Sequence, residues 1–246
     1  MSAKKKSVKA KSAKSAKSAK SAKSKPQKLS KVGKAKISKE SNSDQKNENP
    51  TPAKSGSVKP QKIGGVIHFS DYPSFKPNLT PKQILHMGSF GGTYFRPIYS
   101  SINKQNYKNQ HKQLPADWFT GLNIEKQITS EKCNPEINKY KVKAGSSLTD
   151  WETSGWIKSQ DPYGWFQWYC RFYQGRRTAD DKRQVGRWDN YAGEIRGRWR
   201  RNLIKKCITS NKSHDDATVS PVIRQGLQHW GYMLTKKDYE QFKKKM

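Results

Sequence analysis

The sequence predicts a mainly α-helical protein, α+β at most, in which one compact domain of short helices follows a disordered basic tail. The first observation is the position of the aromatic residues: the 8 Trp, 11 Tyr and 8 Phe all lie after residue 62. Only residues 63–246 can therefore build a core. That region also contains several capping residues followed by a proline or an acid that suits a first helical turn. By contrast, residues 1–62 contain 19 Lys and only 3 acidic residues, a net charge of +16.

The predicted tail, residues 1–62, has too few apolar side chains to order itself. Fixing each residue costs about 1–2 kcal/mol, which sparse aliphatic groups cannot offset. The tail contains the three-residue repeat KSAKSAKSAKSAKSK. A period of three matches neither a helix face nor a strand face, so the lysines supply charge on a mobile chain. Residues 40–62 are polar and contain Pro, Asn and one Gly, residues that break helices and strands, which predicts a linker.

The tail lysines are predicted to contact nucleic-acid phosphates. Duplex DNA carries about one charge per 1.7 Å of axis, and a flexible lysine run can replace its counterions without demanding a base sequence. The candidate residues are Lys4, Lys5, Lys6, Lys11, Lys14, Lys17, Lys20 and Lys23. In composition the segment is similar to linker-histone tails, and phosphorylation of its serines would add about −1.5 to −2 charges each. The alternative is a solubilising or nuclear-targeting tail, with the first three of these lysines as the import-like cluster.

The first helices of the domain are predicted from their caps. Thr80-Pro81 begins a short helix, and Ser147 with Asp150 begins another; each is followed by a glycine that can end it. Residues 88–125 alternate glycine-rich, proline-containing and polar stretches. They predict irregular loops and a small hairpin at most.

A longer helix is predicted to begin at Asp161-Pro162, to end at Gly175 and to carry six aromatic residues. These are Trp165, Phe166, Trp168, Tyr169, Phe172 and Tyr173.

Four further helices are predicted in the C-terminal part. Their starts are Thr178 with Asp181, Glu194, Ser220 with Pro221, and Thr235 with Asp238. The second of these, over residues 194–207, is expected to turn Ile195, Trp199 and Leu203 inward. The last is short and basic.

Three strings of the domain are distinctive: FKPNLTPKQILHMGSFGGTYFRPIYSS, DPYGWFQWYCRFYQGRR and SPVIRQGLQHWGYMLT. They resemble an uncharacterised family of proteins seen in fungi, algae and giant DNA viruses. The likeness covers nearly all of residues 69–235. The resemblance implies the kind of organism or virus in which the protein occurs, but no biochemical mechanism. The lysine-, asparagine- and serine-rich tail would suit an AT-rich giant-virus genome.

Arginine is absent from the tail, yet nine of the chain's eleven arginines fall within 31 positions of the domain. A guanidinium group grips phosphate oxygens bidentately and stacks on aromatic rings, which lysine does less well. The candidate nucleic-acid-binding residues of the domain are Arg171, Arg176, Arg177, Lys182, Arg183, Arg187, Arg196, Arg198, Arg200, Arg201, Lys205 and Lys206. The alternative is that these arginines cover tryptophans and form ion pairs with nearby acids.

Four of the eight tryptophans are predicted to belong to the core rather than to a binding surface. The core set is Trp165, Trp168, Trp188 and Trp230. Base stacking on exposed rings, the mode used for single strands, stays open for Trp199 or Tyr191.

The sequence argues against membrane and secretory classes. No stretch approaches the roughly 18–20 apolar residues of a membrane span, and the start lacks the apolar segment of a secretory signal. The protein is therefore expected to be intracellular, in the nucleus, a virion or a viral factory. Cys133, Cys170 and Cys207 form no close pair, so they are predicted to be reduced, mostly buried thiols.

No cofactor, metal site or catalytic residue is predicted. GSFGG at Gly88–Gly92 lacks the GK[ST] ending of a phosphate-binding loop and is expected to be a turn. The five histidines show no metal-ligand spacing. His214-Asp215-Asp216 is expected to lie in a solvent-exposed loop.

The formal charge of +31 suggests a polyanionic partner, of which nucleic acid is the commonest, with duplex DNA favoured over RNA. The sequence therefore predicts an architectural, largely sequence-nonspecific DNA-binding protein that condenses or packages DNA and is not an enzyme. The first alternative is a structural virion or nucleoid protein whose domain binds itself or other packaging proteins. The second is a DNA-modifying enzyme of unrecognised class.

Overall fold

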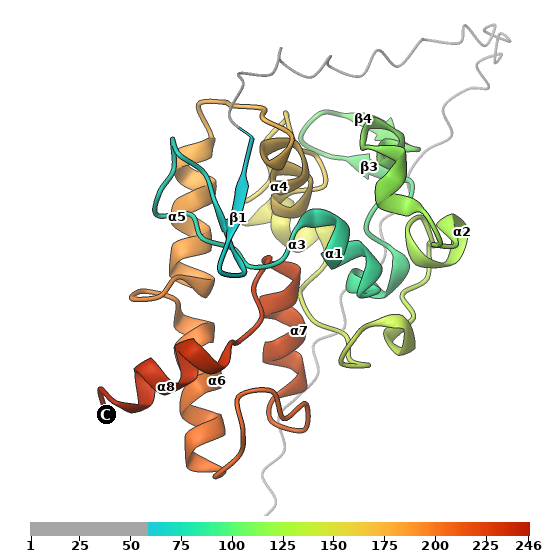
Figure 1. The fold of residues 1–246 in the computed structure, drawn as a ribbon. Coiled ribbons are helices and arrows are strands. Elements are labelled where there is room, and N and C mark those ends of the chain that lie inside the picture. Colours follow the sequence, from blue (N-terminus) through green and yellow to red (C-terminus); the bar gives the residue numbers. More distant parts are fainter. Residues whose placement is uncertain (1–58) are drawn as a thin grey trace, which may run out of the picture. The chain divides into compact units, whose positions relative to one another are not determined.

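The computed structural model describes residues 59–246 and contains a mainly helical domain with two small hairpins (Figure 1). The predicted fold class is thereby confirmed. The helices are α1 Pro81–His86, α2 Ile124–Gln127, α3 Leu148–Thr153, α4 Trp165–Tyr173, α5 Asp181–Ala192, α6 Arg198–Thr209, α7 Pro221–His229 and α8 Lys236–Lys243. The strands are β1 Gln61–Ile63, β2 Val66–His68, β3 Ile98–Ser100 and β4 Gln105–Tyr107. Short 3-10 turns cover η1 Ser89–Gly92, η2 Gln110–Gln113, η3 Ala116–Phe119 and η4 Pro135–Ile137. The predicted disordered tail falls almost wholly on residues outside the described range.

One hairpin was predicted and the other was not. The antiparallel pair β3–β4 lies within the loop-rich segment 88–125. The pair β1–β2 begins at Gln61, just before the expected start of the domain. Its turn is Gly64-Gly65, where both glycines have positive φ, the backbone that a two-residue hairpin turn requires.

The predicted caps of α1, α3 and α8 are confirmed. The Thr80 hydroxyl accepts a hydrogen bond from the Gln83 N–H at 3.1 Å, and the Gln83 side chain accepts one in return from the Thr80 N–H at 2.9 Å. Ser147 forms the same reciprocal pair with Asp150. Thr235 caps α8 through its hydroxyl. Each pair satisfies helix-end N–H groups that would otherwise lack a partner.

Three helix starts were predicted too early, and one of them is that of α5, which begins at Asp181 after Asp180 rather than after Thr178. The aromatic helix α4 begins at Trp165 after Gly164, because the carboxylate of Asp161 binds buried arginines instead of capping a helix. The basic helix α6 begins at Arg198, after a turn in which Gly197 N–H donates to Gly193 O. Ile195, expected to face inward, lies in that turn with 81% of its surface exposed.

The core is assembled around α4. Its Trp168, Tyr169 and Phe172 side chains have no exposed surface. The Phe75 ring lies 5.6 Å from that of Trp168 and 5.2 Å from that of Trp188 on α5. Such aromatic pairs contribute about 0.5–1.5 kcal/mol each beyond the burial of their area. The tryptophans expected in the core are there, although the fourth of them, on the turn after α7, stays half-buried.

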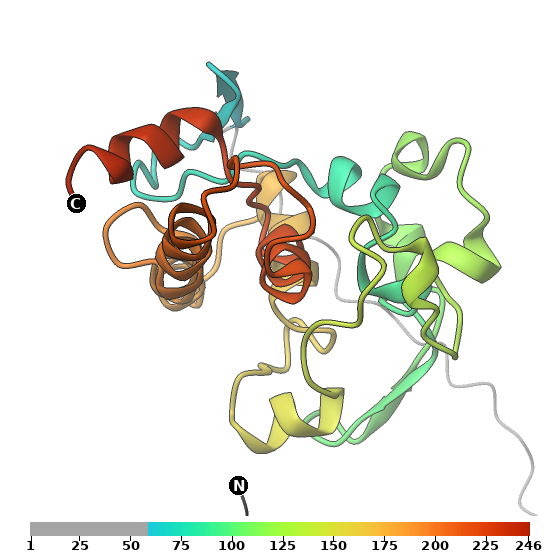
Figure 2. The same cartoon turned by 90° about the horizontal axis from the view of Figure 1, so that it is seen from below.

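The two longest helices, α5 and α6, lie end to end in one column at the left of Figure 1. In Figure 2, which looks along this column, the two coils overlap. Helix α7 packs beside α6, and α8 crosses it. This arrangement leaves one long side of α6 uncovered by the other described elements.

No helix between residues 59 and 246 is long and apolar enough to cross a membrane. As predicted, the three cysteines are free, and two of them are buried: Cys170 and Cys207, with Cys133 exposed.

Candidate nucleic-acid interface

The arginines predicted to bind nucleic acid do not share one surface. Three of them have less than a tenth of their surface exposed: Arg171 (8%), Arg176 (9%) and Arg200 (7%). Their guanidinium groups are used inside the protein and cannot reach a phosphate in this fold.

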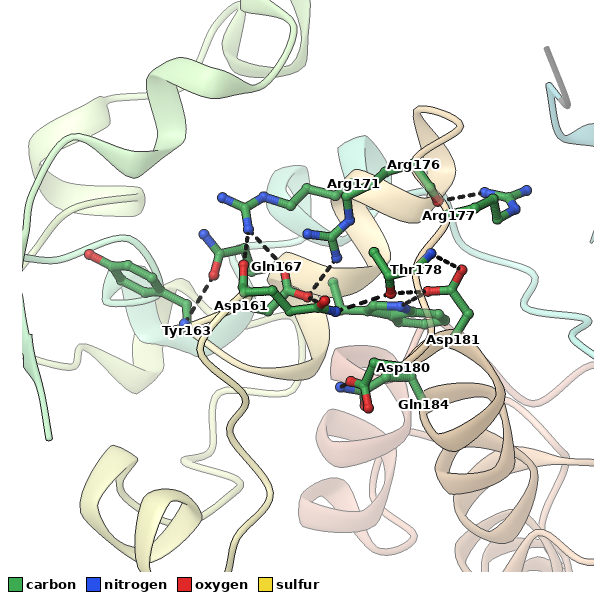
Figure 3. Close-up of polar contacts among 12 residues, drawn as sticks. Asp161, Tyr163, Gln167, Arg171, Arg176, Arg177, Thr178, Asp180, Asp181 and Gln184 are labelled. Atoms are coloured by element: carbon green, nitrogen blue, oxygen red, sulfur yellow. Dashed lines mark hydrogen bonds and ion pairs between the residues drawn. The ribbon is translucent and has the colours of Figure 1, made fainter. Parts of the chain in front are cut away.

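Two of the buried arginines converge on one carboxylate (Figure 3). Asp161, 1% exposed, accepts from Arg171 Nη1 at 2.8 Å and from Arg176 Nη2 at 2.5 Å. Arg171 Nε also donates to Gln113 Oε1 at 2.9 Å. Burial lowers the pKa of Arg171, and the nearby Asp161 charge opposes that shift. The cluster ties α4 to the segment before it, which is a structural role.

The same close-up contains a second buried carboxylate. Asp181 accepts from the indole N–H of Trp168 at 2.8 Å and from the Thr178 backbone N–H, also at 2.8 Å (Figure 3). The pair Thr178 and Asp181, predicted to open α5, therefore holds the start of this helix against the core.

Two other predicted arginines form ion pairs near the surface. Arg177 binds both oxygens of Asp71 and lies 3.7 Å above the Phe172 ring centroid. The hydrogen bond from Arg177 lowers the pKa of Asp71. Arg183 pairs with Asp180 at 2.5 Å within the first turn of α5.

Arg200 fastens α6 to α8. Its Nη2 lies 2.8 Å from Asp238 Oδ1, and its guanidinium lies 4.9 Å from the Tyr232 ring centroid. The carboxylate of Asp238 also accepts from the Tyr232 hydroxyl at 2.7 Å. Arg200 is thus a packing residue, although Arg201, the next residue along the helix, is exposed.

Four basic side chains of α6 are exposed: Arg198, Arg201, Lys205 and Lys206. None of them forms an ion pair or a side-chain hydrogen bond with any residue from 59 to 246. Arg198, Arg201 and Lys205 are spaced three and four apart and share one side of the helix; Lys206 flanks them. We call these four residues the α6 basic face.

The opposite side of α6 explains how a like-charged surface is tolerated. Leu203, Ile204 and Cys207 are buried there, with at most 2% of their surface exposed. Like charges three or four residues apart destabilise a helix by a few tenths of a kcal/mol per pair. Burying an apolar side chain contributes about 1.5–3 kcal/mol, so packing outweighs the repulsion.

Two other predicted cations are exposed outside α6, one in the first turn of α5 and one in the turn before α6. Lys182 on α5 has no ion pair among the described residues, and Arg196 has a loose one with Asp189 at 3.6 Å. The predicted tail lysines, from Lys4 to Lys23, lie outside the described residues.

The glycine-rich segment forms a turn, as expected, and the N–H groups of Gly88, Phe90 and Gly91 are occupied. The Phe90 N–H donates to His229 Nε2 at 3.2 Å, and the Gly91 N–H donates to Asn138 Oδ1 at 2.7 Å. A Cβ on Gly88 would lie 1.7 Å from the Ile137 carbonyl oxygen. The segment is therefore packed against its neighbours and offers no phosphate cradle.

Within the described part of the chain, no group of three or more His, Cys, Asp or Glu residues could hold a metal ion. His214 lies 3.6 Å from Asp215 in the loop after α6, and Asp216 accepts from the Thr218 N–H instead. A small open hollow of about 220 Å³ beside this loop is lined by both signs of charge, from Asp215, Lys236 and Glu240.

Sequence reasoning missed Trp156, which has 45% of its surface exposed and lies beside Arg187. The only sequence signal was an aromatic residue directly after a helix-ending glycine, Gly155, where chains turn at the surface. It also missed His229, because its partner Phe90 is distant in the sequence.

The chain matches no protein-family model, no curated protein and no solved structure. The resemblance to a fungal, algal and giant-virus family therefore stays a prediction.

Proposed function

We propose that the protein is an architectural, largely sequence-nonspecific DNA-binding protein. In this proposal the tail lysines and the α6 basic face both neutralise phosphates of a duplex during condensation or packaging. The supporting observation is the α6 basic face, four exposed cations that have no acidic partner among residues 59–246. The setting that follows is one that contains DNA, such as a nucleus, a virion or a viral factory.

The geometry of α6 suits contact with a phosphate backbone. A helix of 12 residues is about 18 Å long, which matches several phosphates along one strand. Its four cations are long and flexible enough to follow the phosphate backbone. Affinity would come from the release of condensed counterions, which carries no sequence information.

A set of charge-removing variants tests this role. Replacing Arg198, Arg201, Lys205 and Lys206 with Gln should weaken duplex binding and lower the salt slope, the fall of log K with log salt concentration, by up to about 3.6 for four lost contacts. Fluorescence anisotropy with a labelled duplex between about 0.05 and 0.3 M salt measures both quantities.

A matched control removes the same charge elsewhere. Four exposed lysines without ion pairs in the described residues lie in the part of the domain that precedes α3: Lys108, Lys112, Lys126 and Lys132. Their replacement with Gln should change the slope less. Equal slopes for the two variants would mean that net charge alone, and not the α6 basic face, governs binding.

A further inference from the structure

A row of aromatic rings and one guanidinium group runs along α5 toward α6. The Arg187 guanidinium lies 5.5 Å from the Trp156 ring centroid and 5.3 Å from that of Trp230. The Trp230 ring stacks on Tyr191, with centroids 4.7 Å apart and planes 12° from parallel. Tyr191 in turn lies 6.1 Å from Trp199. We call these five residues the aromatic row.

The row differs from the core in its contact with solvent. Trp165, Trp168 and Trp188 are each 7% exposed or less, whereas the members of the row are half-buried and Trp156 is 45% exposed. The Trp156 indole N–H has no partner among residues 59–246. An aromatic ring of this size left in water is costly unless something covers it.

Arg187 is held by rings rather than by a carboxylate. Its one side-chain hydrogen bond within residues 59–246 runs from Nη1 to Gln184 Oε1 at 3.0 Å, and it forms no ion pair with any acid in that range. Burial lowers the pKa of Arg187 to about 10, with the Arg183 charge adding to the shift. The group therefore stays protonated at neutral pH and keeps a positive charge between two indoles.

The row ends at the α6 basic face. The Arg198 guanidinium lies 5.4 Å from the Trp199 ring centroid, so the last ring of the row adjoins the first cation of that face. Tyr191 and Trp199 therefore join the row to the α6 basic face where the chain passes from α5 to α6, the two helices of the column at the left of Figure 1.

We propose that the two end rings of the aromatic row, Trp156 and Trp199, bind unpaired bases of single-stranded nucleic acid, while the α6 basic face holds the adjoining phosphates. Trp230, whose ring stacks on Trp165 at 4.6 Å and on Tyr191 at 4.7 Å, anchors the row to the core. The proposal rests on the proposed function and adds a second form of nucleic acid, the single strand, to those that the domain binds. Base faces are hidden inside a duplex and open in a single strand, where they stack on aromatic rings and guanidinium planes. The free side of Trp156 is the first stacking position.

The alternative is that the row only packs the α5 helix against the chain. The two roles differ for a strand that has phosphates but no bases. A packing role makes bases irrelevant to binding, whereas a stacking role makes them necessary. Because the tail lysines would contact phosphates, their contribution is the same for both kinds of strand and cancels in the comparison.

The test compares the full-length chain on a 20-nucleotide oligo-dT, an abasic strand of equal length and a 20-base-pair duplex at about 0.15 M salt. We expect oligo-dT to bind more tightly than the abasic strand. Trp156→Ala should weaken oligo-dT binding about fivefold or more and leave binding of the abasic strand and the duplex unchanged.

Two further variants keep the result interpretable. Tyr99→Ala removes an aromatic ring that is 57% exposed on β3, outside the row, and should change nothing. Arg187→Lys keeps the charge but loses the planar stack, so it should repeat the selective loss on oligo-dT even if Trp156→Ala folds poorly.

The failures of the two proposals can be told apart. Duplex binding with equal affinity for oligo-dT and the abasic strand would overturn the stacking surface alone. An absence of binding to all three nucleic acids would overturn the proposed function as well.

Discussion

Neighbouring residues of the same type have opposite roles in this protein. Arg200 is buried against Asp238 and Tyr232, whereas Arg201, the next residue, is exposed and unpaired within the described chain. Breaking a buried pair by removing one partner costs about 3–5 kcal/mol. The loss of an exposed cation costs little stability, so only the exposed residues can be tested for binding without damage to the fold.

His229 is the residue with the clearest predicted pH response. Its Nε2 accepts from the Phe90 N–H at 3.2 Å, and the Gln225 amide lies 3.0 Å from the same atom. The Phe90 ring stacks 4.1 Å from the imidazole. Burial lowers the pKa of His229 from 6.5 to about 3. The imidazole is therefore neutral in the folded protein at any pH well above 3.

The sign of the effect follows from linkage. Below about pH 6.5 the unfolded chain gains a proton at this histidine that the folded chain does not, so stability is full above pH 6.5 and falls as the pH drops toward 3. We expect a loss of about 2 kcal/mol between pH 7 and pH 5. Urea unfolding at both pH values measures it.

His229→Gln is the control, because glutamine can accept the same hydrogen bond but does not titrate. His111, whose pKa is also lowered by burial, contributes equally to both proteins. An equal loss of stability in the wild type and the variant would show that His229 is not the group responsible.

At the scale of single elements, local signals were predictable and distant partners were not. The starts of α1 and α3 follow from cap residues within one turn, so the sequence contains the whole interaction. The start of α4 was misplaced because Asp161 looks like a cap locally. Its actual partners, Arg171 and Arg176, are fixed only once the chain has folded.

The same reasoning applies to the candidate interface. The sequence identifies the arginine cluster, but whether a guanidinium is buried depends on where distant acids such as Asp71 and Asp238 lie. The hairpin β1–β2 did carry a local signal, the pair Gly64-Gly65. Its strands of three residues are too short to show an alternating pattern.

The like-charged side of α6 leads to a prediction in which stability and binding change in opposite directions. Arg201→Glu replaces the repulsion between Arg201 and Lys205, four residues later, by an attraction, and an acid that precedes a lysine by four residues is the more stabilising order. The substitution also places a negative charge in the N-terminal half of α6, where the helix dipole favours it. We expect an unfolding free energy about 0.5–1 kcal/mol higher and clearly weaker duplex binding.

Thermal unfolding and anisotropy titration of the same preparation measure the two effects. Arg201→Gln, which removes the repulsion without adding attraction, should fall between the wild type and the glutamate variant in both. If the glutamate variant loses stability, Arg201 has a structural contact and the α6 basic face is smaller than inferred.

At the scale of the whole molecule, the positive charge is divided between two parts of the chain. Residues 1–58 contain 17 Lys and 3 acidic residues, a net charge of +14, so residues 59–246 retain +17 of the total +31. Each part alone exceeds what a compact protein needs for solubility. If both parts contact phosphates, each should contribute its own share of the salt dependence.

Deletion of residues 1–58 separates the two contributions. The cut leaves β1 intact, since Gln61 pairs with His68 in the first hairpin. We expect the remaining domain to retard duplex DNA at about 0.15 M salt, with a smaller salt slope than that of the full-length chain, because fewer counterions are released. Electrophoretic shifts over a salt series measure both slopes.

The outcome decides between the proposed function and its structural rival. If residues 1–58 bind DNA and the domain does not, the domain instead contacts protein, as a virion or nucleoid component would, and the α6 basic face would have to meet an acidic protein surface. If the full-length chain holds duplexes equally well in half-molar salt, counterion release does not drive binding. In that case the positive charge of the two parts is not the source of the affinity for DNA.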